Sequence, residues 1–254
     1  MTNHQFSVYG IGNAIMDLQL QAQNSDITAL NLTKGGMALV DTERQQEILS
    51  YLASSKDKSF QINKASGGSA ANTMIAINQL GGKAAYGCLV GDDDFGKHYC
   101  SEMRDLGVVL HNSQVTNGVT GSSIIIITPD AERTMNTHLG ISAEFSAAHV
   151  SEKCISEAEW LYVEGYLFAS EPGRAAISEA VRIAKKVGTK VAVTFSDAFI
   201  VNVFGDFLRE IVAQSDLIFA NFTEARAFTG MEDEDQLAYL RAQAAQDAAI
   251  ATLQ

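Results

Sequence analysis

The stretch Ala65-Ser-Gly-Gly-Ser-Ala-Ala-Asn72 decides the fold, because two different local patterns meet in it. Residues 60 to 64 before it have the composition of a polar strand, and apolar residues after it recur at the helical period as far as Leu80. Adjacent glycines let backbone N–H groups approach a ligand without a Cβ in the way, and a helix start adds partial positive charge there. We therefore expect strand, tight turn and helix, with Ser69 as the helix cap.

Three residues of this stretch are candidate binding residues: Gly67, Gly68 and Asn72. Asn72 lies one turn into the expected helix, so its amide points back toward the glycine turn. A helix cap preceded by a glycine turn, without any ligand, is the simpler explanation of the stretch when it is taken alone. Its role therefore depends on what the rest of the chain brings near it.

Strand and helix patterns alternate along the remaining chain. Apolar runs of strand length stand at residues 8–12, 84–90, 160–163, 190–195 and 217–220. Helical patterns stand at residues 42–52, 95–106, 173–187 and 206–213, and again from Thr223. This alternation predicts an α/β fold with a mostly parallel central sheet covered by helices on both faces.

A second set of strands is half polar and does not fit a buried parallel sheet. These strands stand at residues 18–22, 37–40, 124–127 and 133–139. We expect them to form a small separate sheet that lies over one edge of the central sheet as a lid. Residues 1–254 then form a single domain, with the lid built from segments of about 15–60 and 110–140.

Composition excludes several classes of partner. Thirty acidic and 18 basic residues give a net charge of -12, which repels nucleic acid. The three cysteines are far apart, which predicts neither a disulfide framework nor a zinc site. No apolar run is long enough to span a membrane, and Met1 to Tyr9 lacks the form of a signal peptide. We expect a cytoplasmic protein with no nucleic-acid or membrane partner.

Two glycine motifs fail as nucleotide-binding loops. Gly10-x-Gly12 follows a strand, but the third glycine of a dinucleotide motif would fall at Ile15. Residues 91–97 have the spacing of a phosphate loop, yet His98 replaces the required Ser or Thr and three aspartates would repel phosphate. The second motif is better interpreted as a turn whose acidic residues begin a helix.

Polar residues follow the first strand, where parallel sheets place their ligands. Asn13 and Asp17 offer an amide and a carboxylate, which suit two neighbouring hydroxyls of a sugar. A solvated carboxylate at a strand end is the alternative for Asp17.

Asn221 and Glu224 open the helix after the strand at 217–220, and a carboxylate there could order Mg²⁺ through water near a phosphate chain. A plain helix cap is the alternative for this pair. Arg133, on an expected lid strand, could reach a phosphoryl group, or could be an ordinary exposed arginine.

Taken in order, these pieces resemble the PfkB-type kinases, the ribokinase and adenosine kinase family. The Gly67-Gly68-x-x-x-Asn72 stretch, followed by Gly81-Gly82 and by residues 91–96, is similar to that family's N-terminal signature. Asn221-x-x-Glu224 is similar to its Asn-x-x-Glu motif. The resemblance implies a ribokinase-like three-layer α/β/α fold with a β-sheet lid, and transfer of a phosphoryl group from ATP to a hydroxyl, with Mg²⁺.

The resemblance also implies roles for the candidate residues. Asp17, Gly68 and Asn72 would hold sugar hydroxyls. Asn221 and Glu224 would organise Mg²⁺ and the ATP phosphates, and Arg133 would neutralise charge on the moving phosphoryl group.

The spacing of Asn13 and Asp17, and the segment from Thr134 to Gly140, resemble bacterial adenosine-kinase-like members. Met135 and Leu139, with Ile15 and Met37, would line the lid with an apolar surface that suits a flat purine. In Gly165-Tyr166-Leu167, however, Leu167 stands where some adenosine kinases offer an aromatic ring.

One family segment is not found in the sequence. The family's Gly-Ala-Gly-Asp motif, which carries the anion hole and the general base, does not occur, so we expect residues 1–254 to be inactive as given. A sugar kinase for ribose, fructose or a related compound is the alternative substrate class. A non-catalytic nucleoside-binding or regulatory protein is the alternative function, and a homodimer through the lid is a possible assembly.

Overall fold

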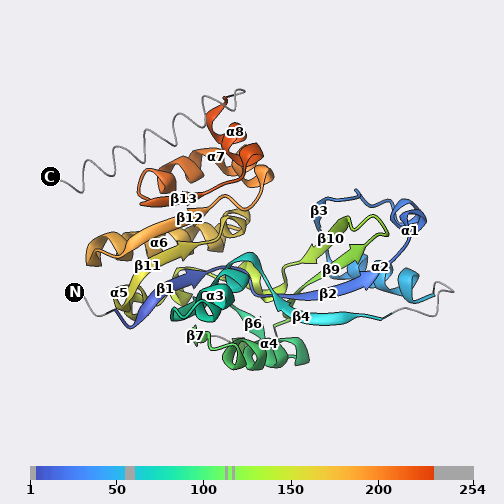
Figure 1. Ribbon diagram of the computed structural model, residues 1–254, viewed down its shortest axis with the longest axis horizontal. Coiled ribbons are helices and arrows are strands. Elements are labelled where there is room, and N and C mark those ends of the chain that lie inside the picture. Colours follow the sequence, from blue (N-terminus) through green and yellow to red (C-terminus); the bar gives the residue numbers. More distant parts are fainter. Residues whose placement is uncertain (1–3, 55–60, 112–113, 116–117, 232–254) are drawn as a thin grey trace.

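The computed structural model describes residues 4–54, 61–111, 114–115 and 118–231, and Figure 1 shows their arrangement. A six-stranded parallel sheet has the order β13-β12-β11-β1-β5-β7. Its strands are β1 (Phe6–Ile11), β5 (Ala84–Gly87), β7 (Val109–His111), β11 (Ala158–Val163), β12 (Lys190–Thr194) and β13 (Leu217–Phe219). The predicted parallel central sheet is confirmed.

Helices cover both faces of this sheet because its strands are apolar on both sides. One face packs against α3 (Ser69–Gln79) and α4 (Asp94–Asp105). The other face packs against α5 (Glu152–Glu157), α6 (Glu171–Val187) and α7 (Ala198–Val212). Along β11, for example, Leu161 and Val163 face the second group of helices, whereas Tyr162 faces the first. The result is a three-layer α/β/α body.

The four half-polar strands form a separate sheet, as the sequence predicts, and the strand before the glycine turn, which the sequence analysis did not place there, joins it as a fifth. Its order is β3-β10-β9-β2-β4, and it extends from the main body in Figure 1. The strands are β2 (Ile15–Gln21), β3 (Met37–Leu39), β4 (Asn63–Gly67), β9 (Gly121–Ile127) and β10 (Arg133–His138). We call this sheet the lid sheet.

The outer face of the lid sheet is covered by α1 (Asn24–Ala29) and α2 (Thr42–Ser54). Leu18, Ile124 and Ile126 of the sheet pack there against Ile27 and Ile48 of the helices. The outer face of the lid sheet therefore forms the core of the lid, and the inner face is left for a ligand.

The homodimer through the lid stays a prediction, as does the division of the chain into a single domain with a lid.

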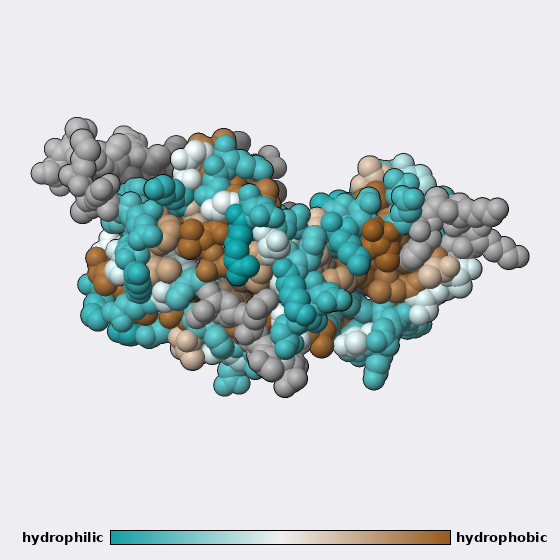
Figure 2. All heavy atoms as spheres, turned by 90° about the horizontal axis from the view of Figure 1, so that it is seen from below, coloured by the Kyte–Doolittle hydropathy of each residue, from teal (hydrophilic) through white to brown (hydrophobic). Residues whose placement is uncertain are grey.

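The remaining elements are short. Strands β6 (Val90–Gly91) and β8 (Gln114–Val115) pair with each other, and α8 (Phe222–Thr229) follows β13. The 3₁₀ helices within the described part of the chain are η1 (Gly140–Glu144), η2 (Ala147–His149) and η3 (Gly165–Ala169). Among the described residues no helix combines the length and apolar character that crossing a membrane requires. Seen from below in Figure 2, the surface is mostly hydrophilic, with hydrophobic groups gathered in separate places on the body and on the lid.

Several local expectations differ from the structure. Gly68 is the N-cap of α3, and Ser69, expected as the cap, is the first helical residue. Strand β4 runs to Gly67 because its pairing with β2 continues to Ile15. Helix α7 begins at Ala198, earlier than the predicted 206, because Asp197 caps it by accepting from the N–H of Phe199 at 2.7 Å.

Candidate active site

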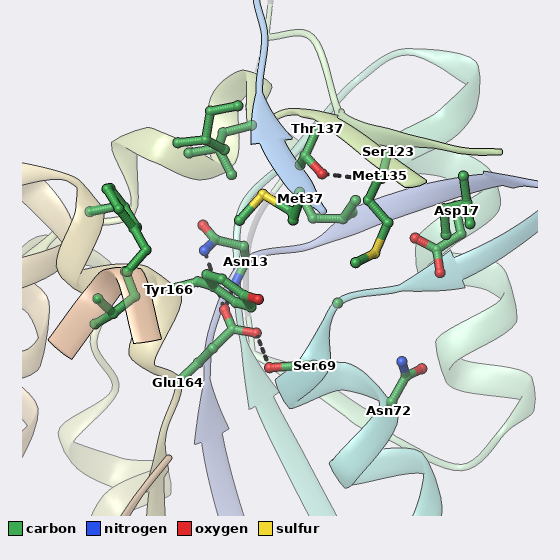
Figure 3. A pocket seen from close by; sticks show the side chains of 18 of the residues that line it. Asn13, Asp17, Met37, Ser69, Asn72, Ser123, Met135, Thr137, Glu164 and Tyr166 are labelled. Atoms are coloured by element: carbon green, nitrogen blue, oxygen red, sulfur yellow. Dashed lines mark hydrogen bonds between the residues drawn. The ribbon is translucent and has the colours of Figure 1, made fainter. Parts of the chain in front are cut away.

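A cavity of about 230 Å³ lies between the inner face of the lid sheet and the main body (Figure 3). The body contributes the segments that follow β1 and β11 and the first turns of α3 and α7. These segments lie at the carboxyl ends of parallel strands, where α/β sheets bind their ligands. The lid contributes side chains from β2, β3, β9 and β10. Both halves of the fold therefore form one candidate site.

One end of the cavity is suited to hydroxyl groups. Asp17 on β2 and Asn72 on α3 both line it, beside the backbone of Gly68. Burial raises the pKa of Asp17 to about 6, although the charge of Arg133 lowers it. Gly67 lies behind the carboxylate, where a Cβ would come within 2.5 Å of Asp17 Cγ. Gly68 has a φ of 101°, a conformation that favours glycine, so neither position accepts a side chain without a change at the site.

Glu164, directly after β11, holds the body side of the cavity together. Its Oε2 accepts hydrogen bonds from the backbone N–H of Asn13 at 2.7 Å and from the Asn13 amide at 3.2 Å. Its Oε1 accepts from the Ser69 hydroxyl at 2.7 Å (Figure 3). It also accepts from the N–H of Ala70 at 3.0 Å.

Burial raises the pKa of Glu164, and these four hydrogen bonds limit the rise. The carboxylate thus joins the β1–β2 connection to the start of α3, where the helix dipole favours negative charge.

The other end of the cavity is largely apolar. Tyr166 from η3 and Phe199 from α7 line it on the body side. Met37, Ile125 and Met135 line it on the lid side. A flat ring fits between an aromatic wall and flexible methionines better than a bare sugar does.

The sequence places an aliphatic residue, Leu167, where some adenosine kinases offer an aromatic ring. In the structure the preceding residue, Tyr166, supplies an aromatic ring to the cavity. Leu167 is only 1% exposed and belongs to the main core, whereas Tyr166 lines the cavity. Burial, with the charges of Asp197, Glu164 and Glu224, raises the pKa of Tyr166 to about 12, so its hydroxyl stays protonated near neutral pH.

Most of the predicted site residues come together. The cavity is lined by Asn13, Asp17, Gly68, Asn72, Arg133, Met135 and Leu139. Gly67 lies behind Asp17 rather than on the cavity wall. Their roles toward a ligand remain predictions.

Asn221 and Glu224 are not among the residues that line this cavity. Asn221 Oδ1 accepts from the N–H of Glu224 at 2.8 Å, and the Glu224 carboxylate accepts from the N–H and amide of Asn221 at 3.1 and 2.7 Å. The pair is thus a capping box at the start of α8. Among the described residues no cluster of three His, Cys, Asp or Glu side chains could hold a metal ion.

Among the lining residues that the sequence analysis did not predict to bind a ligand, Ser69, Ser123, Thr137 and Glu164 carry small polar or acidic side chains. Glu164 directly follows an apolar strand, so the strand-end rule that selects Asp17 could also have found it. Thr137 lies in the segment from Thr134 to Gly140 that the resemblance picks out, whereas Ser123 belongs to no motif. Only the register of β9 and β10 places them opposite each other.

Comparison with known proteins assigns the family. The model of the pfkB family carbohydrate kinases matches residues 30–253. The chain belongs to this family. The crystal structure of adenosine kinase from Sinorhizobium meliloti is 33% identical and superposes with a TM-score of 0.85 over 94% of this chain and 72% of that one. A probable sugar kinase protein from Rhizobium etli CFN 42 gives the same values. These similarities confirm the ribokinase-like α/β/α fold.

A curated relative is similar over a shorter length. Ribokinase from Haemophilus influenzae is 28% identical over 179 residues, which are 69% of this chain and 55% of the ribokinase. The chain thus matches only about half of the length of that relative. Proteins similar to this pfkB family chain include both nucleoside and sugar kinases, so family membership leaves the substrate open.

Proposed function

We propose that this chain forms the substrate-binding part of an ATP-dependent kinase that phosphorylates a hydroxyl group of an adenosine-like nucleoside. The observation that supports it best is one cavity with a half-buried carboxylate at one end and an aromatic and methionine-lined space at the other. A nucleoside has the same two parts, a polar sugar and a flat base. Family membership supports the phosphotransfer chemistry.

At the polar end, Asp17 accepts hydrogen bonds from two neighbouring sugar hydroxyls. Asn72 supplies one donor and one acceptor beside it, and the backbone N–H groups near Gly68 add further donors. Asn13 is held in place by Glu164, which leaves its amide oxygen to accept from Ser142 Oγ at 3.2 Å. The sugar is thus bound by groups whose orientation is fixed before it arrives.

At the apolar end, the base lies between Tyr166 and the lid. Met135 and Leu139 contribute to the lid side, as the sequence predicts. Contact with both walls excludes water from the sugar, which favours transfer of the phosphoryl group to a hydroxyl over transfer to water.

Magnesium and the ATP phosphates are assigned to Asn221 and Glu224. Glu224 is only 6% exposed, and its carboxylate oxygens retain lone pairs beyond those used in the capping box, which suits a contact with Mg²⁺ through water. Bound Mg²⁺ would neutralise charge on the transferred phosphoryl group. Arg133, exposed on the lid and lining the cavity, would add a second positive charge.

A sugar kinase is the second candidate. The resemblance to the ribokinase and to the probable sugar kinase favours it, and Asp17 with Asn72 suits a free pentose or hexose as well. The aromatic wall formed by Tyr166 and Phe199 favours the nucleoside.

Calorimetry with adenosine, ribose and fructose separates these functions. We expect adenosine to bind residues 1–254 more tightly than either sugar, and Asp17→Ala to abolish binding. Tighter binding of a sugar would establish the second candidate, and unchanged adenosine binding in the variant would refute the site.

Turnover is tested separately from binding. We expect residues 1–254 to bind adenosine but not to phosphorylate it with MgATP, since the sequence lacks the Gly-Ala-Gly-Asp motif. A steady release of ADP that depends on adenosine would contradict this prediction. Binding without turnover in the protein purified from its natural source, at the same 27.3 kDa, would favour a nucleoside-binding or regulatory role instead.

A further inference from the structure

A polar row crosses the inner face of the lid sheet. Asp17 on β2 is paired with Ser123 on β9, and Ser123 is paired with Thr137 on β10. All three residues line the cavity, and Figure 3 shows them on the strands above it. Because neighbouring strands lie about 4.8 Å apart, the carboxylate and the two hydroxyls extend over about 10 Å.

Apolar rows flank this polar row on both sides. Two residues further along the strands, Ile125 is paired with Met135 and Met135 with Met37. Toward the body, Ile15 and Leu139 line the cavity. Hydroxyls at Ser123 and Thr137 thus interrupt a surface that is otherwise suited to an apolar ring.

The two hydroxyls satisfy each other when no ligand is bound. Ser123 Oγ and Thr137 Oγ1 are 2.8 Å apart, so one donates to the other. The accepting hydroxyl keeps its own hydrogen, and both oxygens keep free lone pairs. The pair can therefore donate one hydrogen bond to a ligand and accept another, without an unsatisfied polar group in the empty cavity.

We propose that the Ser123–Thr137 pair is a specificity-determining subsite that hydrogen-bonds the base of the nucleoside. This inference rests on the proposed function, in which Asp17 holds the sugar hydroxyls. The row begins at that carboxylate, and Thr137 lies two strands away from it. A free pentose bound to Asp17 spans about one strand spacing, whereas a nucleoside reaches across two. The pair thus meets the base and not the sugar.

The test compares adenosine with ribose in the double variant Ser123→Ala with Thr137→Val. We expect adenosine affinity to fall about tenfold and ribose affinity to stay within about twofold. Ser122→Ala is the matched control, because this neighbouring serine faces the opposite side of β9 and donates to Gln45 Oε1 at 3.0 Å. Thr137→Ser, which keeps the hydroxyl, should retain the adenosine affinity.

Three results would overturn the inference. Unchanged adenosine affinity would mean that the pair only joins β9 to β10. An equal loss for adenosine and ribose would mean that the pair contacts the sugar. No adenosine binding by the unmodified protein, with ribose bound, would refute the proposed nucleoside function itself, and the inference with it. Circular dichroism of each variant confirms that the fold is kept.

Discussion

The raised pKa of Asp17 makes ligand binding depend on pH in a range that is easily measured. Sugar hydroxyls donate to the ionised carboxylate, so the protonated form should bind poorly. With a pKa of about 6, about nine in ten of these groups are protonated at about pH 5, and nearly all are ionised at about pH 8. The dissociation constant for adenosine should therefore be about tenfold higher at about pH 5 than at about pH 8.

The same group affects the stability of the free protein in the opposite direction. The pKa of Asp17 is higher in the folded protein than its usual 3.8, so folding favours the protonated form. The protonated carboxyl group therefore stabilises the folded protein most below about pH 4. This stabilisation is lost as the pH rises through about 6 and the group ionises. Because the group is only half-buried, solvent screening reduces this contribution to about 1 to 2 kcal/mol.

Calorimetry of adenosine binding between about pH 5 and pH 8, together with urea denaturation over the same range, measures both effects. Asp17→Asn should remove the pH dependence of binding and of stability together. Arg133→Gln should shift the midpoint of binding to higher pH, because the charge of Arg133 lowers the pKa of Asp17. An adenosine affinity that is constant across this range would refute the reasoning, as would an Asp17→Asn variant that keeps the pH dependence.

Three substitutions test other parts of the site. Glu164→Gln should lower the free energy of unfolding by about 2 to 3 kcal/mol, because an amide nitrogen then faces buried donors such as the Asn13 N–H. A urea denaturation midpoint equal to that of the unmodified protein would contradict this prediction. Gly67→Ala should displace the Asp17 carboxylate and weaken adenosine binding about tenfold with the fold retained, and calorimetry showing full affinity would refute it. Glu224→Ala should cost about 1 kcal/mol through loss of the α8 cap, measured by thermal denaturation, and a melting temperature equal to that of the unmodified protein would contradict this.

The sequence predicts the layers of the fold well because hydrophobic period is a local property. Fully apolar runs become β1, β5, β11 and β12 of the body, and the half-polar runs become strands of the lid sheet. Short elements such as α1 and α5, with six residues each, escape prediction because so few residues give no clear period. The sequence predicts the start of α7 at residue 206, whereas the helix begins at Ala198. Its cap, Asp197, comes directly after the short loop that follows β12.

Some residues of the candidate site can likewise be found from local sequence patterns, and others cannot. Asn13 and Asn72 are found from the sequence because one follows a strand and the other lies in the first turn of a helix, and such positions meet at one edge of a parallel sheet. The same rule selects Asp17, although the structure places it within β2 of the lid sheet. Tyr166 and Leu167 are not distinguished, because the direction of neighbouring side chains in a 3₁₀ turn depends on which one the core accepts.

The sequence by itself determined most of the strands and helices, four of the five strands of the lid sheet, and which end of the central sheet carries the polar residues. Only the tertiary structure decided that Glu164 joins Asn13 to the start of α3 across 151 positions of the chain. It alone also decided that Ser123 faces the cavity opposite Thr137 while Ser122 faces α2. The reason is that a local pattern fixes the shape of a segment, whereas strand order and register fix its neighbours.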